Sequence, residues 1–419
     1  MTGFIDILRS GSWLTRERMR LVGLALLAAF VLGAGFLIAT SNGLNDRFGR
    51  PLGTDFSNVY AAGTYVLDGE PSAPFDPPRQ YAREQAIFGQ ATQFYGWHYP
   101  PYFLGLAALL AAIPYWLALI VWQGTTLGLY LLSIRAIVPR PLPIMGMKSD
   151  HFWVVLALAF PAVFINLGQA HNGFLTAALF GAALVILVER PILAGVLIGC
   201  LAYKPQFGLL IPLVLIASGR WRAFASAAVT VAVMTLAVTF AFGFDVWSAF
   251  FATSKFTRTV VLEQGGTGWY KIQSVFSWVR MWGGGIALAY AAQAAITLAV
   301  AAALCWLWRS RAPYPLKAAG LLIGTLLATP YSLDYDLMLL APAIAYLSVD
   351  GFARGFGPYE KTIVAALWIV PLVARSVPQA TLIPLAVPTM LLALVFLLRR
   401  AMNECGAPGL WHFAARPLK

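Results

Sequence analysis

Apolar runs long enough to cross a lipid bilayer recur along almost the whole chain. The first extends from Leu21 to Thr40, and 60% of all residues are hydrophobic while only 11% are charged. A helix of about 20 apolar residues spans the hydrocarbon core, and a chain inside lipid must satisfy its backbone hydrogen bonds internally. We therefore predict an all-α, polytopic transmembrane protein that forms one domain over residues 1–419.

Lys and Arg residues fall mostly between these runs, and they indicate which loops face the cytoplasm. Arg16, Arg18 and Arg20 precede the first run, and no small-x-small cleavage site follows it, so we expect a signal anchor with a cytoplasmic N-terminus. The net charge of +12 fits topology and lipid headgroups better than nucleic acid. Further inside loops are indicated by Arg135, Arg140 and Lys148, by Arg190, by Arg220 and Arg222, by Arg309 to Lys317, by Arg354 to Lys361, and by Arg399 and Arg400.

These runs and loops predict about twelve spans with both termini inside. Residues 101–138 hold two apolar stretches broken at Pro114, and we expect the first to lie at the membrane interface and the second to cross. The other expected spans are 21–40, 151–165, 173–188, 192–203, 206–218, 222–243, 284–308, 316–330, 335–349, 361–374 and 381–398.

Three segments on the opposite, periplasmic side carry unusual contents. Residues 41–100 form the expected first periplasmic loop, and residues 244–283 combine aromatic and basic side chains, which is typical of interfacial helices. The runs 192–203 and 206–218 are short and meet at Tyr203-Lys204-Pro205-Gln206. We expect this turn below the outer surface, where broken helices line a cavity.

Asp55 follows the first span, and a carboxylate in that position is costly unless it is paired, solvated or used. With Lys204 and the polar groups of other external loops, it suits sugar transfer from a phosphate-linked donor. Asp55 would deprotonate the acceptor hydroxyl, and Lys204 would offset the charge of the departing phosphate. The alternatives are that Asp55 caps a helix starting at Phe56 and that Lys204 snorkels to the surface.

Other polar residues of the external loops are candidates for substrate contacts. We expect Gln206 to join Lys204 at the donor phosphate. His98 could equally be an interfacial belt residue, and loop hydrogen bonding is the alternative role for Asn166, Gln169, His171 and Asn172. The predicted substrate-binding residues are Asn58, Tyr60, His98, Tyr99, His171, Tyr331 and Asp334.

Asp334-Tyr335-Asp336 has the DxD pattern of metal-dependent sugar transferases. The segment could instead cap a helix that starts near Tyr335. A hard divalent cation wants several oxygen ligands, and the chain's three Cys and four His residues show no metal-binding spacing. We therefore predict no metal site and no cofactor.

Four motifs stand out along the chain: Asp55-Phe56-Ser57-Asn58-Val59-Tyr60-Ala61-Ala62-Gly63 with Gly69 and Tyr81, Tyr99-Pro100-Pro101-Tyr102-Phe103, Tyr203-Lys204-Pro205-Gln206, and Pro330-Tyr331-Ser332-Leu333-Asp334-Tyr335-Asp336. Together they resemble the motifs of bacterial glycosyltransferase family 87, over roughly residues 20–400. The family includes the mycobacterial phosphatidylinositol mannoside mannosyltransferases.

This resemblance implies a GT-C type fold of transmembrane helices with outer interfacial helices. It also implies a polyprenyl-phosphate sugar donor, often of mannose, and inversion at the anomeric carbon. The acidic base of GT-C enzymes lies in the first external loop, which corresponds to Asp55. The late motif of the family often carries His where this chain has Tyr331, and this departure puts a catalytic His at that position in doubt.

Two other classes of membrane protein compete with this interpretation. A lipid or sugar transporter, or a flippase, would share the many spans, but we find no internal repeat. An O-antigen ligase or polymerase would carry its large external loop later in the chain. The expected partners are thus a polyprenyl-phosphate-linked sugar, a lipid or glycan acceptor and membrane lipids. We expect a multi-pass protein of the bacterial inner membrane with its site facing the periplasm.

Overall fold

The computed structural model describes residues 2–138 and 152–406, and within these ranges the regular elements are helices. Backbone pairing in this part of the chain is limited to three isolated bridges. The all-α prediction is therefore confirmed. Arg140 and Lys148, which helped to assign an inside loop, lie outside the described residues, as do His151 and His412.

Among the described residues, six helices are long and apolar enough to cross a membrane, or seven if one bent pair counts as a span. The bent pair is α7 (Phe152–Leu158) and α8 (Pro161–Gln169), which meet at 51°. The six are α2 (Arg16–Ala39), α6 (Tyr115–Ile137), α12 (Trp221–Phe242), α15 (Ile286–Arg309), η7 with α17 (Asp334–Leu339 and Leu340–Arg354), and α20 (Ala386–Gly406).

Fewer helices are long enough to cross a membrane than the roughly twelve spans that the sequence predicts. Several of the expected spans form helices too short to cross alone, because 15 residues rise only about 22 Å. Such helices need protein around them to shield their ends. They are α9 (Gly173–Ile186), α10 (Pro191–Cys200) with η3 (Leu201–Tyr203), η4 (Pro205–Gly208) with α11 (Leu210–Ala217), α16 (Tyr314–Ala328) and α18 (Glu360–Val373).

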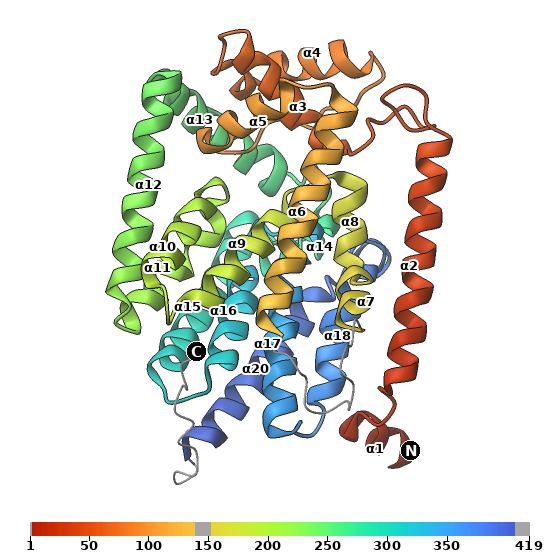
Figure 1. Cartoon of the computed structure of the whole chain (residues 1–419), viewed down its shortest axis with the longest axis vertical. Coiled ribbons are helices and arrows are strands. Elements are labelled where there is room, and N and C mark those ends of the chain that lie inside the picture. The colour runs from red at the N-terminus through yellow and green to blue at the C-terminus, as the bar shows by residue number, and fades with distance from the viewer. Residues whose placement is uncertain (1, 139–151, 407–419) are drawn as a thin grey trace, which may run out of the picture.

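The segment between α2 and α6 forms a helical cap at one end of the molecule (Figure 1). Pro114 separates the short α5 from α6, whose 23 residues are long enough to cross a membrane, as the prediction for 101–138 requires. Buried Glu84 holds the cap's last loop by accepting from the backbone N–H groups of Tyr95 and Gly96, both at 3.0 Å. The cap contains α3 (Thr54–Leu67), η1 (Ala73–Phe75), α4 (Pro77–Phe88), η2 (Pro101–Phe103) and α5 (Leu104–Ala111).

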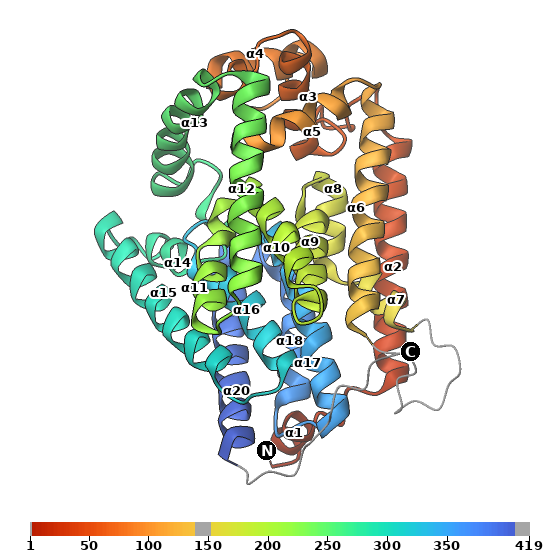
Figure 2. The same cartoon turned by 60° about the vertical axis from the view of Figure 1, so that its left-hand side comes forward.

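The segment 244–283 is also helical and begins beside this cap. Figure 2 shows α12 rising to α13, and α13 contacts the cap where the Thr253 hydroxyl donates to the Phe75 carbonyl of η1. Large apolar side chains of this region face outward, with Phe244 74% and Phe251 62% exposed. This exposure is typical of a helix lying against lipid. The segment comprises α13 (Asp245–Phe256), η5 (Thr257–Glu263), η6 (Trp269–Lys271) and α14 (Val275–Met281).

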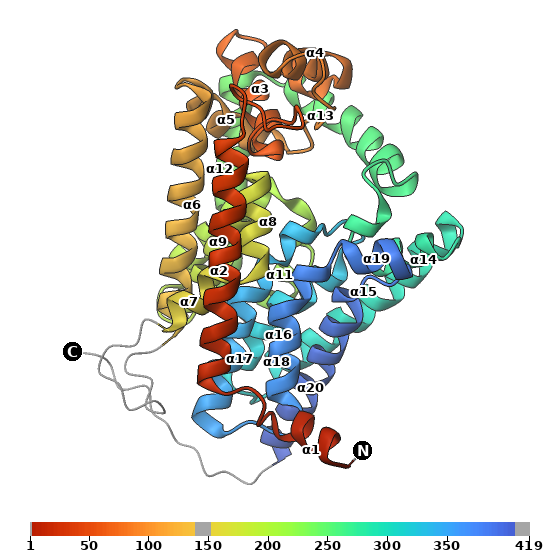
Figure 3. The same cartoon turned by 90° about the vertical axis from the view of Figure 1, so that its right-hand side faces the viewer.

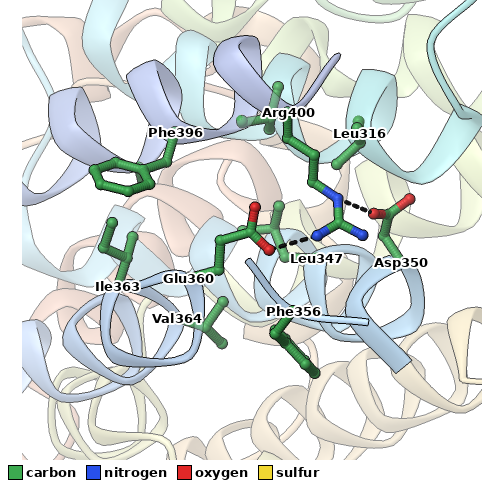
Figure 4. Close-up of a pocket in the computed structure, with 11 residues that line it drawn as sticks. Leu316, Leu347, Asp350, Phe356, Glu360, Ile363, Val364, Phe396 and Arg400 are labelled. Carbon is green, nitrogen blue, oxygen red and sulfur yellow. Dashed lines mark hydrogen bonds and ion pairs between the residues drawn. The ribbon is translucent and has the colours of Figure 1, made fainter. Parts of the chain in front are cut away.

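A buried ion network joins three helices at the opposite end, where α1 (Thr2–Ser10) also lies (Figure 3). Arg400 of α20 pairs with Asp350 of α17 at 2.6 Å and with Glu360 of α18 at 2.5 Å. Figure 4 shows the Arg400 guanidinium between the two carboxylates, and Arg354 also pairs with Asp350. Breaking such a buried network is expensive, so it fixes how these helix ends meet.

Close contact between α3 and α5 depends on Gly63. A Cβ atom at this position would lie 2.1 Å from the Ala107 carbonyl oxygen, which is backbone and cannot move aside easily. Gly63→Ala should therefore force the two helices apart, at a cost of about 1–3 kcal/mol. Thermal unfolding of the purified variant would measure this. The control is Gly105→Ala in α5, where no atom lies within 4 Å of the added Cβ, and equal melting temperatures would contradict the argument.

Candidate active site

Asp55 lies in the first turn of α3, immediately after a tight turn at Gly53. The Gly53 φ of 70° is left-handed, and a Cβ there would lie 2.8 Å from the Cβ of Ala170, at the end of α8. Glycine thus lets the start of α3 approach the end of α8 closely. The N-cap of α3 is Gly53 and the helix begins at Thr54, so the alternative that Asp55 caps it is wrong.

A chain of polar contacts links Asp55 to the C-terminal half of the protein. With the Gln169 amide oriented to satisfy both neighbours, its nitrogen donates to Asp55 Oδ2 at 3.0 Å and its oxygen accepts from Arg375 Nη2 at 2.5 Å. Arg375 also forms a two-pronged pair with fully buried Asp334, in which Nη2 lies 3.1 Å from Oδ1 and Nε contacts Oδ2. Bidentate pairs of this kind fix orientation as well as charge.

Lys204 lies at the break between α10 with η3 and η4 with α11, and its side chain is buried. Its Nζ lies 2.5 Å from Asp336 Oδ1, and Lys204 is only 3% exposed. The alternative that Lys204 snorkels to the surface is therefore wrong. Asp336 Oδ2 accepts from the Leu333 N–H at 3.0 Å, so this carboxylate also caps the start of η7, as the sequence allowed.

Aromatic rings connect these two ion pairs. The His171 ring stacks on Tyr335 with centroids 3.4 Å apart, and its Nε2 lies 2.9 Å from the hydroxyl of Tyr99. Lys204 Nζ lies 5.2 Å from the Tyr335 ring centroid, a cation–π distance. The Asn166 amide donates to the Tyr335 carbonyl at 3.0 Å and thereby holds the segment in place. Asn166 therefore has the loop hydrogen-bonding role that was its alternative.

The remaining predicted substrate residues lie in different surroundings. Asn58 is buried, and its Oδ1 has no hydrogen-bond partner among the described residues. The Tyr60 hydroxyl donates to the Ile113 carbonyl at 3.0 Å, and the half-buried His98 lies 2.9 Å from Thr257 of η5 through Nδ1. Gln206 is half-buried in η4. Tyr331 packs on a small apolar cluster of Leu262, Ile272, Phe276, Ala289 and Leu333.

The surroundings of Asp55 shift the pKa of its carboxyl group toward neutral pH. Burial raises the pKa of Asp55 to about 7, and the Arg375 charge opposes that rise while Asp334 adds to it. Lys271 and Lys204 also favour the ionised carboxylate. Burial lowers the pKa of His98 to about 4, so that ring is neutral under the same conditions. A carboxylate whose pKa is near 7 exchanges protons readily at physiological pH.

Sequence reasoning missed Arg375 and the direct contact of Gln169 with Asp55. Arg375 begins residues 375–380, a segment that the distribution of Lys and Arg predicts to be an external loop. Arginine is depleted in external loops by the positive-inside rule, and that exception was the available signal. No comparable signal existed for Gln169, because its contact depends on how α8 ends.

The DxD carboxylates are each engaged by a cation of the protein, Asp334 by Arg375 and Asp336 by Lys204. Across residues 2–138 and 152–406, no group of three or more His, Cys, Asp or Glu side chains could hold a metal ion. The two carboxylates thus belong to a cluster of charged groups, and Gln169 links Asp55 to this cluster.

Removing Lys204 should leave Asp336 as a buried, unpaired charge. Lys204→Met should lower the free energy of unfolding by about 3–5 kcal/mol. Adding Asp336→Asn should restore much of it, because the amide oxygen still accepts from Leu333 without a charge. Glu70→Gln breaks the exposed pair with Arg79 and should cost about 1 kcal/mol or less. Denaturation in detergent measures all three, and a double variant no more stable than Lys204→Met would contradict the pairing argument.

Comparison with known proteins agrees with the resemblance noted in the sequence. The model of glycosyltransferase family 87 matches residues 97–330, more than half of the chain. Lys204 and His171 lie inside the matched region, whereas Asp55, Asp334 and Arg375 lie outside it. No curated protein and no solved structure matches the chain significantly. The match favours transfer over transport: the chain belongs to glycosyltransferase family 87 and is a membrane-embedded enzyme that transfers sugar.

Proposed function

We propose that the protein transfers a hexose, with mannose the first candidate, from a polyprenyl-phosphate-linked donor to a lipid or glycan acceptor at the periplasmic face, with inversion. The observation that carries this proposal is a half-buried Asp55, with its pKa raised to about 7, which Gln169 links to Arg375 and on which the charge of Lys204 also acts. A base and two cations are what the reaction needs: one group to take a proton and others to receive a leaving phosphate.

The proposed chemistry uses Asp55 as general base. The acceptor hydroxyl gives its proton to the Asp55 carboxylate while its oxygen attacks the anomeric carbon from the face opposite the phosphate. The bond between that carbon and the phosphate oxygen breaks, and polyprenyl phosphate leaves with the electron pair. Lys204 and Arg375, with Lys271 contributing charge, stabilise the negative charge that develops on the phosphate. Gln169 forms a hydrogen bond with both Asp55 and Arg375 and so fixes the position of one relative to the other.

The lipid-linked donor is supported by how the cluster relates to the membrane. Its residues come from turns at the ends of apolar helices, where a phosphate can meet water while its chain stays in lipid. The outward-facing Phe244 and Phe251 give the neighbouring 244–283 segment an apolar surface for that chain. Mannose is proposed from the resemblance to the mycobacterial phosphatidylinositol mannoside enzymes.

Substrate-binding roles are proposed for the polar residues near the cluster. Lys204 and Gln206 would contact the donor phosphate, and the unpartnered Oδ1 of Asn58 would accept from a sugar hydroxyl. His98, Tyr99, His171, Tyr331 and Asp334 remain predicted substrate contacts. Tyr60, whose hydroxyl is occupied by the Ile113 carbonyl, would act by packing on the start of α6.

Asp55→Asn should abolish transfer and leave folding intact, since the amide keeps the shape but cannot take a proton. General bases contribute about 10²–10⁴-fold in rate. In the unmodified enzyme only ionised Asp55 works, so a pKa raised to about 7 means that kcat/KM falls as pH drops through 7 and levels off above it. Sugar transfer into lipid by purified enzyme measures both. Asp245→Asn, an exposed carboxylate in the first turn of α13, is the control. Near-normal turnover of Asp55→Asn would refute the assignment.

Transfer should not require a divalent cation, because Asp334 and Asp336 are already paired with Arg375 and Lys204. Enzyme treated with a chelator should keep its rate, and Mg²⁺ or Mn²⁺ should add nothing. Loss of activity that either ion restores would instead assign the two carboxylates to a metal.

The external position of the site is testable by labelling. With Cys200, Cys305 and Cys405 replaced, single cysteines at the exposed Gln93 and Gln264 should react with an impermeant reagent in intact spheroplasts. A cysteine at the exposed Arg222, on a predicted inside loop, should react only after permeabilisation. The reverse pattern would put Asp55 in the cytoplasm, where nucleotide sugars are made, and would overturn the lipid-linked donor.

A further inference from the structure

A cavity lies far from Asp55, between α2 and the helices α6, α7, α17 and α18. Its volume is about 640 Å³, within the range of 300–1,000 Å³ that is usual for binding sites of small molecules. In Figure 3, α2 stands between α6 on the left and α18 on the right. The 24 residues of α2 rise roughly 36 Å, and Asp55 follows its far end while the cavity adjoins its first turns.

The walls of this cavity are almost entirely apolar. They are formed by aliphatic and aromatic side chains from five helices, and none of the lining residues is Asp or Glu. Typical wall residues are Val22, Ile134, Leu156, Ile344, Phe352 and Trp368. Polar small molecules gain little from such a surface, whereas a hydrocarbon chain is favoured by burial of its apolar area.

One end of the cavity is basic. Arg16, Arg18 and Lys361 line it together with Trp13. Within the described residues, no carboxylate lies within salt-bridge distance of Arg18 or Lys361. Arg18 donates to the Trp13 carbonyl at 3.1 Å, and Lys361 Nζ lies 5.6 Å from the Phe356 ring centroid. These contacts direct the side chains without neutralising them.

The indole of Trp13 completes this end by donating to Thr362 at 3.2 Å, which ties the turn before α2 to α18. Tryptophan is enriched at headgroup depth, and basic loops face the cytoplasm. The basic end therefore belongs at the inner membrane surface, where anionic lipids are concentrated. An apolar cavity that ends in cations at that depth has the polarity of an anionic lipid.

We propose that this cavity binds an anionic phospholipid of the cytoplasmic leaflet, with its phosphate on Arg18 and Lys361 and its acyl chains against α2, α6 and α17. The site is separate from the transfer reaction and does not depend on the proposed donor. A lipid held there fills the space between α2 and the bundle and thereby supports the helix that leads to the catalytic cap.

Native mass spectrometry of the full chain in detergent tests the proposal with three probes: dioleoylphosphatidylglycerol, dioleoylphosphatidylcholine and glycerol 3-phosphate. The first should bind about tenfold more tightly than the second, and the third should not bind, because charge and acyl chains are both needed. Arg18→Gln with Lys361→Gln should weaken the phosphatidylglycerol complex about tenfold, since each charge near a membrane surface contributes several-fold. Arg18→Lys with Lys361→Arg should preserve it.

The matched control is Arg222→Gln with Arg309→Gln, which removes two exposed charges from the same membrane end but outside the cavity, and which should change nothing. Ala366→Phe narrows the cavity from α18 while keeping every charge, and it should also weaken binding. Equal loss in the control pair, equal binding of phosphatidylcholine, or unchanged binding in both cavity variants would overturn the proposal. Preferential capture of a polyprenyl phosphate over the phospholipid would overturn it as well, by assigning the cavity to a lipid carrier.

Discussion

The buried ion pair between Lys204 and Asp336 is the constraint on which the rest of the site depends. Neither charge is tolerable alone in an apolar interior, so each requires the other. Lys204 stands where a helical segment breaks, and Asp336 stands where another begins. Satisfying the pair brings two segments 132 residues apart into contact at 2.5 Å. Tyr335 lies between Asp334 and Asp336 in the sequence, so the same ion pair helps to place its ring against His171.

Arg375 and Asp334 form a second ion pair of this kind. Gln169 joins Arg375 to Asp55, which is the last residue in this series of contacts. Gln169 is the only neutral link in that series, so it transmits position without adding charge. Asp55 thus feels Arg375 without forming a direct ion pair with it, and burial outweighs the attraction, which leaves its pKa near neutrality rather than depressed. A direct salt bridge would have made the carboxylate a weaker base. The intervening amide is therefore what suits Asp55 to the proposed role of proton acceptor.

Much of this arrangement was readable from the sequence, because hydropathy and charge act locally. The helical class, the short helix before Pro114 and the buried turn at Lys204 all followed from run length and composition. The number of spans did not, because short apolar runs look alike whether they cross lipid or pack inside protein. The contact of Gln169 with Asp55 was missed for a different reason: it arises where the end of α8 meets α3, and no local pattern encodes that meeting. Arg375 did leave a local signal, an arginine in a predicted external loop, but its partner Asp334 is 41 residues away.

The two ends of the molecule use arginine and lysine in opposite ways. Toward the cap, Lys204 and Arg375 are each paired with a carboxylate of the protein. At the opposite end, Arg400 lies between Asp350 and Glu360, while Arg18 and Lys361 line one end of an apolar cavity and have no carboxylate partner among the described residues. A cation paired with a carboxylate is held in a fixed position, whereas a cation without such a partner near the membrane surface attracts anionic lipid headgroups. If both proposals hold, the pairing of each cation, more than its presence, distinguishes the proposed reaction site from the proposed lipid site.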